Sequence, residues 1–177
     1  MRNNAVFLAT AAALILVAAC NRGEDAAPTS DNQAEAADNV ANGTASTEDH
    51  AAIMKARHDH YEEMGDAMKA IGVQLKADSP SLPTIQQHAA TMARYAPQVL
   101  TWFPEGSGPE SGRETRAKAE IWSDPETFRQ RAQAFEAEAQ RFNATVQSGD
   151  VAAIRAGQKA LGDTCKNCHD RFRAPED

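Results

Sequence analysis

The pentapeptide Cys165-Lys166-Asn167-Cys168-His169, close to the C-terminus, is the most informative stretch of this sequence. Two cysteines three residues apart lie on the same side of a helix, and C-x-x-C-H is the attachment signature of a c-type haem. In that chemistry the two thiols add to the vinyl groups of the porphyrin, and the adjoining histidine is the proximal ligand of the iron. The pentapeptide therefore predicts one covalent haem c, held by Cys165 and Cys168, with His169 as the metal ligand.

Three other uses of this cysteine pair are possible. One is a local disulfide, and another is half of a zinc site. A zinc site needs a second pair of ligands, and the remaining cysteine, Cys20, lies far away in the sequence. A thioredoxin-like redox pair is expected near a βαβ pattern, and the sequence contains no strand pattern. These considerations favour covalent haem.

Length and composition restrict the number of domains, the kinds of partner and the fold class of this chain. A chain of 177 residues is typical of one domain with appendages. The formal net charge of −7 argues against nucleic acid as a partner. Aromatic residues make up only 6% of the chain and alanine is abundant, so helices are favoured over strands.

Residues 1–19 predict a signal peptide. Arg2 supplies a short positive start, and the uncharged run that follows is shorter than a membrane-spanning helix needs. The run ends in Val17-Ala18-Ala19-Cys20, which resembles the lipobox of bacterial lipoproteins, where cleavage leaves an acylated cysteine at the N-terminus. We therefore expect a periplasmic protein that is anchored to a bacterial membrane by lipid on Cys20. The alternative is ordinary secretory cleavage near Ala19, which would leave a soluble periplasmic protein.

Residues 20–48 predict a disordered acidic tether between this anchor and the folded domain. The segment is rich in small and polar residues, and it carries six acidic side chains against the single positive charge of Arg22. Such a composition cannot bury enough apolar surface to offset the entropy of ordering the chain.

Residues 49–177 predict an all-α, antiparallel four-helix bundle. The first helix is expected over about residues 49–77, and the second begins after Pro83, with Pro97 kinking it or ending its regular part early. The third helix begins at Asp124-Pro125, and the fourth spans about residues 151–172, so the haem motif faces the interior from the last helix. Each helix carries an apolar stripe at steps of three or four residues, which Arg57 interrupts in the first helix. The stripes are Ile53, Arg57, Tyr61, Met64, Met68, Ile71 and Leu75; Ile85, Ala89, Met92, Ala96, Val99 and Phe103; Phe128, Ala132, Phe135, Ala139, Phe142 and Val146; and Ile154, Gly157, Leu161, Cys165, Cys168 and Phe172.

Three segments of this region are similar to the class II c-type cytochromes, the cytochrome c′ family. They are the stretch Trp102-Phe103-Pro104-Glu105-Gly106-Ser107, the segment 116–125 with Glu120-Ile121-Trp122-Ser123-Asp124 and the following Phe128, and the C-terminal stretch 165–173. The resemblance covers roughly residues 51–173. A haem motif at the end of a four-helix pattern is specific, because most other c-type cytochromes carry the motif near their start.

The resemblance implies roles for several further residues. Arg173 matches a basic residue that lies beside the proximal imidazole, and Arg57 matches a first-helix arginine near the haem propionates. The alternative for Arg57 is a solvated surface charge. Trp122, Phe128 and Phe135 would line the haem crevice, and simple core packing is the alternative for them.

The residue four positions after that arginine faces the open side of the iron in the family, and here it is Tyr61. A neutral phenol, with an ordinary pKa of about 10, is a poor ligand for ferrous iron. The resemblance therefore implies a five-coordinate haem that binds nitric oxide. Competing ligands are weaker: His58 and His60 flank the stripe and are expected at the solvated surface, and Met64 is expected to fill the core.

The leading functional hypothesis is one-electron transfer by a non-enzymatic, membrane-tethered haem protein whose redox partners are membrane-associated. The first alternative is a dedicated nitric oxide binding or buffering protein. The second is a six-coordinate, low-spin electron carrier with a distal methionine or histidine. A peroxidase-like activity lacks support, because no distal acid–base pair can be placed opposite His169. The resemblance also allows a homodimer through the outer faces of the first two helices.

Overall fold

The computed structural model describes residues 47–175 of the chain. The predicted signal peptide 1–19 and the anchor residue Cys20 lie outside the described residues, as does nearly all of the tether 20–48. The described helices are α1 (Thr47–Lys76), α2 (Leu82–Tyr95), the 3-10 helices η1 (Ala96–Trp102) and η2 (Pro109–Ser111), α3 (Glu120–Ser123), α4 (Pro125–Val146) and α5 (Val151–Phe172).

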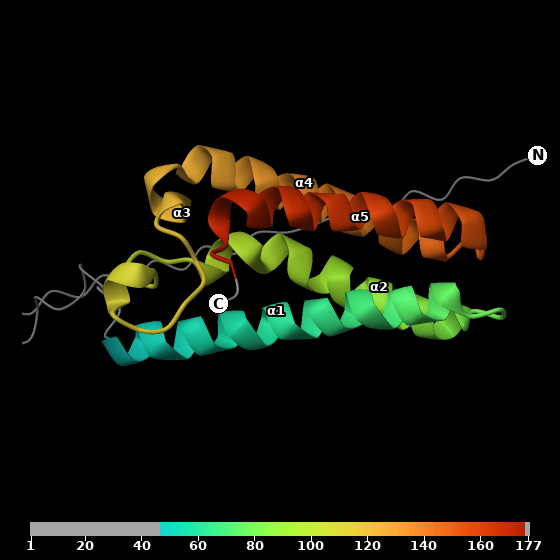
Figure 1. The fold of residues 1–177 in the computed structure, drawn as a ribbon, viewed down its shortest axis with the longest axis horizontal. Helices are drawn as coiled ribbons and strands as arrows, with labels where there is room; N and C mark the ends of the chain where they lie inside the picture. Colours follow the sequence, from blue (N-terminus) through green and yellow to red (C-terminus); the bar gives the residue numbers. More distant parts are fainter. Residues whose placement is uncertain (1–46, 176–177) are drawn as a thin grey trace, which may run out of the picture. The chain divides into compact units, whose positions relative to one another are not determined.

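The four long helices α1, α2, α4 and α5 run antiparallel and pack side by side (Figure 1). This arrangement confirms the all-α four-helix bundle. Between residues 47 and 175 there is no strand, and the only β-type pairing is an isolated bridge between Ala117 and Arg173. None of the helices described is long and apolar enough to cross a membrane.

The helix ends follow from local chemistry. The Ser81 side chain caps α2 by accepting a hydrogen bond from the Thr84 backbone N–H, and Asp124 caps α4 in the same way through Thr127. Asp150 caps α5 by accepting from the backbone N–H groups of Ala152 and Ala153 at 2.9 and 3.1 Å. Pro97 has the predicted effect, because regular α-helix stops at Tyr95 and the chain continues as the 3-10 helix η1.

The predicted apolar stripes line the core of the bundle. Among their members, Ile71, Ile85, Ala89, Ala139, Phe142, Val146, Ile154 and Leu161 have no exposed surface. Gly157 sits on the α5 stripe because α4 approaches closely there, and an added Cβ would lie 2.9 Å from Cδ2 of Phe142. This packing turns the last two turns of α5, which carry the C-x-x-C-H motif, toward the interior.

Candidate functional site

Cys165, Cys168 and His169 lie in the last two turns of α5. All three are half-buried, whereas the intervening Lys166 and Asn167 are exposed. The two cysteines are not joined by a disulfide, and both pack against the hydrophobic core. Helical spacing therefore presents two free thiols on the inward face and places the imidazole beside them.

The environment of the two thiols keeps them protonated. Burial raises the pKa of Cys165 and raises that of Cys168 to about 11, with the neighbouring Cys165 adding to the effect on Cys168. A thioredoxin-like redox cysteine needs a lowered pKa, so this alternative does not fit the site. Within residues 47–175 no group of three or more histidine, cysteine or acidic side chains is placed to hold a metal ion.

The imidazole of His169 is held in its neutral form. Burial lowers its pKa, and the positive charges of Arg173 and Arg116 lower it further, while Asp170 opposes them. A neutral imidazole has a free ring nitrogen for a metal, whereas the protonated ring has none.

Tyr61 lies on α1 and is half-buried, within electrostatic range of both thiols. Its ring packs edge-on against Trp102, with centroids 5.3 Å apart, and contacts Phe103 at 6.3 Å. Burial raises the pKa of the Tyr61 hydroxyl well above its ordinary value, and negative charge on Cys168 would raise it further. The phenol is therefore protonated at physiological pH.

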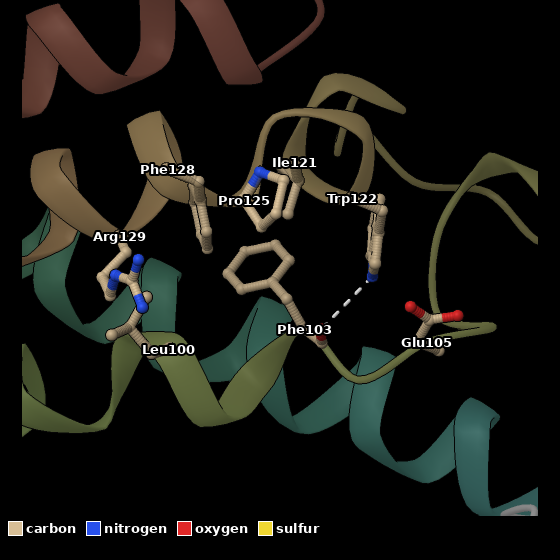
Figure 2. Close-up of a pocket in the computed structure, with 8 residues that line it drawn as sticks. All are labelled: Leu100, Phe103, Glu105, Ile121, Trp122, Pro125, Phe128 and Arg129. Carbon is tan, nitrogen blue, oxygen red and sulfur yellow. Dashed lines mark hydrogen bonds between the residues drawn. The ribbon is translucent and has the colours of Figure 1, made fainter.

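Phe103 is the centre of an aromatic cluster between η1, α3 and α4 (Figure 2). Its ring lies 5.0 Å from Phe128 and 6.1 Å from Trp122, and Phe128 in turn lies 5.2 Å from Phe172 at the end of α5. The Trp122 indole N–H donates to the carbonyl oxygens of Phe103 and Pro104 at 3.2 and 3.1 Å. Two residues predicted to line the haem crevice, Trp122 and Phe128, therefore both contact the Phe103 ring. The sequence analysis did not predict this central position of Phe103.

A surface groove of about 330 Å³ opens beside this cluster (Figure 2). Its lining consists of Leu100, Phe103, Glu105, Ile121, Trp122, Pro125, Phe128 and Arg129. None of the three motif residues lines the groove. The groove is therefore separate from the donor groups that would hold a haem.

Arg57 is only 5% exposed, so the alternative of a solvated surface charge is wrong. Its two terminal nitrogens donate to the Trp102 carbonyl at 3.2 Å, to the Ser107 hydroxyl and carbonyl at 3.1 and 2.9 Å, and to the Thr115 hydroxyl at 3.2 Å. The guanidinium also lies 4.6 Å from the centre of the Phe103 ring. Arg57 thus ties α1 to the loop between residues 102 and 115.

The two histidines beside Tyr61 behave differently. His58 is exposed and pairs with Glu62 at 3.3 Å, as predicted for a surface residue. The same prediction is wrong for His60, whose ring is half-buried between Tyr95 and Trp102, 4.8 Å from each. Both aromatic partners come from elsewhere in the chain, so helical periodicity gave no sign of this contact.

Sequence and structure comparisons agree with this arrangement. A family model described as Cytochrome C′ matches residues 52–173. The chain belongs to the cytochrome c′ family. Cytochrome c′ of Rhodospirillum rubrum is 36% identical over 126 residues, covering 71% of this chain and 84% of that protein. Cytochrome c′ of Pararhodospirillum photometricum is 31% identical over 122 residues, covering 69% of this chain and 96% of that protein.

Solved structures of the cytochrome c′ family share the bundle. A nitric oxide complex of a cytochrome c prime variant from Alcaligenes xylosoxidans matches with a TM-score of 0.63 and 26% identity. That match covers 74% of this chain and 98% of the other. Cytochrome c′ from Thermochromatium tepidum matches with a TM-score of 0.65 at 22% identity, which shows a common fold.

The described residues fit the covalent haem of a cytochrome c′. The donor set consists of two neutral, unbonded thiols on one helical face and a neutral imidazole next to the second thiol. Aromatic rings from α1, η1 and α4 contact one another in or beside the hydrophobic core against which both cysteines pack, and such surroundings suit a large apolar group. Phe135 is buried in the core, which is the alternative given for it. Its role in lining a haem crevice stays a prediction.

Proposed function

We propose that this protein is a periplasmic cytochrome c′ that carries single electrons on one covalently bound haem c. The observation that carries the proposal is the inward-facing C-x-x-C-H motif in the last helix of the bundle. When bound, the haem supplies a one-electron iron couple and an iron site for a small diatomic ligand. Cys165 and Cys168 would bond to it covalently, and His169 would be the proximal iron ligand.

The surroundings of His169 suit a redox role. Half-burial limits contact with water, and the neutral state of the ring leaves a lone pair for the metal. The positive charges of Arg173 and Arg116 lie near the ring and disfavour additional positive charge at the site. Together these features would raise the reduction potential above that of a solvated haem.

Tyr61 supports a five-coordinate iron that is open to nitric oxide. Its buried phenol stays protonated and offers no anionic donor. The nitric oxide complex of the Alcaligenes xylosoxidans relative supports the same capacity here. Binding or buffering of nitric oxide is therefore the second candidate function, and it is compatible with electron transfer.

Two observations speak against the low-spin alternative with a distal methionine or histidine. Met64, one turn from Tyr61, is 5% exposed and belongs to the hydrophobic core. The His60 ring is held between Tyr95 and Trp102. Both side chains are therefore already packed against protein neighbours, as core or structural residues are.

We also propose contacts with the haem propionates for Arg57. Its buried, positively charged guanidinium is the support for this role. Since both terminal nitrogens already donate to backbone and hydroxyl acceptors, a propionate would have to share them or replace some of those bonds.

Membrane attachment through Cys20 is part of the same proposal, and its support is the sequence Val17-Ala18-Ala19-Cys20. A lipid anchor and an acidic tether would confine the haem domain near membrane-associated redox partners. Incorporation of labelled palmitate into the wild-type chain, and its loss in Cys20→Ala, would test the anchor. Equal labelling of both would contradict it.

The haem itself is tested by producing the chain in a bacterium that matures c-type cytochromes. We expect a covalent haem stain on a denaturing gel, weakened in Cys165→Ala or Cys168→Ala and lost in the double variant. Cys20→Ala is the matched control, because it removes a thiol outside the motif. An undiminished stain in the double variant, or a colourless folded wild type, would reject the proposal.

Optical spectra then rank the candidate functions. We expect the purified protein to be reduced and reoxidised reversibly, with high-spin spectra in both states, and to form a nitric oxide adduct when reduced. A low-spin spectrum before any ligand is added would reject the Tyr61 assignment and favour the low-spin carrier.

A further inference from the structure

The connector that precedes α3 pairs with the chain that follows α5. The Lys118 N–H donates to the Phe172 carbonyl at 3.0 Å, and the Ala174 N–H donates to the Arg116 carbonyl at 2.8 Å. These bonds flank the isolated bridge between Ala117 and Arg173. We call the paired segments 116–118 and 172–174 the clasp. Figure 1 shows the tail leaving α5 at the end of the bundle where the motif lies.

The Arg116 side chain strengthens the clasp. Its Nε and Nη2 groups both donate to the Ala174 carbonyl, at 3.1 and 2.8 Å. The last carbonyls of a helix lack partners within the helix, and here the Arg173 N–H returns to the His169 carbonyl at 3.0 Å. Arg116 therefore holds the chain directly beyond the turn of α5 that carries His169.

The connector is also fixed on its other side, to α1. The Thr115 hydroxyl accepts from Arg57 at 3.2 Å and from the Ala117 N–H at 3.1 Å. Arg57 precedes Tyr61 by one helical turn. A continuous set of hydrogen bonds thus joins the Tyr61 side of the site to the His169 side.

We propose that Arg116 is a positioning residue for His169: by gripping the Ala174 carbonyl it fixes the last turn of α5 and keeps two guanidinium groups beside the imidazole. This inference rests on the proposed function, in which His169 binds the haem iron. Its consequence is that Arg116 helps to set the orientation of the proximal imidazole and the reduction potential, although it lies in a connector some fifty residues from the motif.

The test compares Arg116→Ala and Arg116→Lys in the full chain. Lysine keeps the charge but loses the planar pair of donors. The comparison therefore separates the effect of the hydrogen bonds to the Ala174 carbonyl from the electrostatic effect. Arg155→Ala removes an exposed charge from the first half of α5 and is the matched control. Circular dichroism shows that each variant is folded.

Hydrogen exchange of the peptide that contains residues 172–174 reports the clasp without reference to the haem. We expect exchange about tenfold faster in Arg116→Ala, clearly faster in Arg116→Lys, and unchanged in Arg155→Ala. In the haem-loaded protein, we expect the iron–histidine stretching band in the resonance Raman spectrum to shift in both Arg116 variants. The reduction potential should fall most in Arg116→Ala.

Unchanged exchange in Arg116→Ala would overturn the inference. Faster exchange with an unmoved Raman band and potential would overturn it as well, because Arg116 would then serve only the local clasp. A folded wild type without covalent haem would instead overturn the proposed function and with it the role toward iron, while the exchange measurement would still decide whether Arg116 secures the end of α5.

Discussion

Arg57 holds Ser107 at two points: it donates to the Ser107 hydroxyl at 3.1 Å and to the Ser107 carbonyl at 2.9 Å. Ser107 has no exposed surface. A residue of the first helix therefore fixes a loop fifty positions later. This loop carries Phe103, whose carbonyl oxygen accepts from the Trp122 indole N–H of α3 and whose ring contacts the Trp122 ring.

Replacing Arg57 should cost stability, whatever its role toward a haem. In Arg57→Ala, buried carbonyl and hydroxyl groups lose their donors. We therefore expect the free energy of unfolding to fall by about 2–4 kcal/mol. Arg57→Lys should recover only part of this loss, because an ammonium lacks the planar fork. Urea denaturation measures both, and a loss in Arg57→Ala no larger than that of an exposed-arginine control such as Arg155→Ala would contradict the bracing role.

Tyr61→Met should convert the haem from five-coordinate, high-spin to six-coordinate, low-spin. The substitution places a thioether, a good ligand for haem iron, where the buried phenol offers none. Tyr61→Phe is the matched control and should remain high-spin. Optical and electron paramagnetic resonance spectra distinguish the states, and a high-spin Tyr61→Met protein would show that position 61 does not face the iron.

Alkaline pH gives a separate test of the Tyr61 environment. Because burial raises the pKa of the Tyr61 hydroxyl above its ordinary value, the unfolded chain releases this proton before the folded one does. The stabilising contribution is therefore complete below about pH 10 and is lost as the pH rises above it. Urea midpoints should fall above about pH 10, and less steeply in Tyr61→Phe. Identical profiles would indicate an exposed hydroxyl.

Gly106 is a position where a side chain should not be tolerated. Its φ is +81°, and an added Cβ would lie 2.5 Å from Cε1 of His50. We expect Gly106→Ala to lower the free energy of unfolding by about 1–3 kcal/mol. Gly112 has a φ of +68° with nothing within 4 Å of an added Cβ, so Gly112→Ala should cost only the backbone strain.

The double variant His50→Ala, Gly106→Ala isolates the contact between these two residues. It should regain the part of the loss that exceeds the Gly112→Ala value, because the smaller side chain removes the clash. Equal losses in the two single glycine variants would show that the His50 ring moves aside without cost.

Helix positions were largely predictable from the sequence because the signals are local. The last helix was predicted over residues 151–172 and is observed as Val151–Phe172, between the Asp150 cap and Pro175. The first was predicted over residues 49–77 and is observed as Thr47–Lys76. Apolar periodicity and capping residues act within a few positions of one another, so they can be recognised without the tertiary structure.

Contacts across the bundle were not predictable in the same way. His60 was expected at the surface, and its ring lies between Tyr95 and Trp102. Phe103 was one member of a stripe, and it is the centre of the aromatic cluster. Each of these environments is made by side chains from other helices, and sequence spacing on one helix carries no information about its neighbours.

By itself, the sequence determined the four amphipathic helices, their capping residues and the inward orientation of Cys165 and Cys168, because these depend on spacing along one helix. Only the tertiary structure decided which loop Arg57 braces, what covers His60, and that Arg116 grips the chain beyond His169. Those contacts join residues that are more than thirty positions apart, and their geometry is set by how the helices pack and where the connectors cross the end of the bundle.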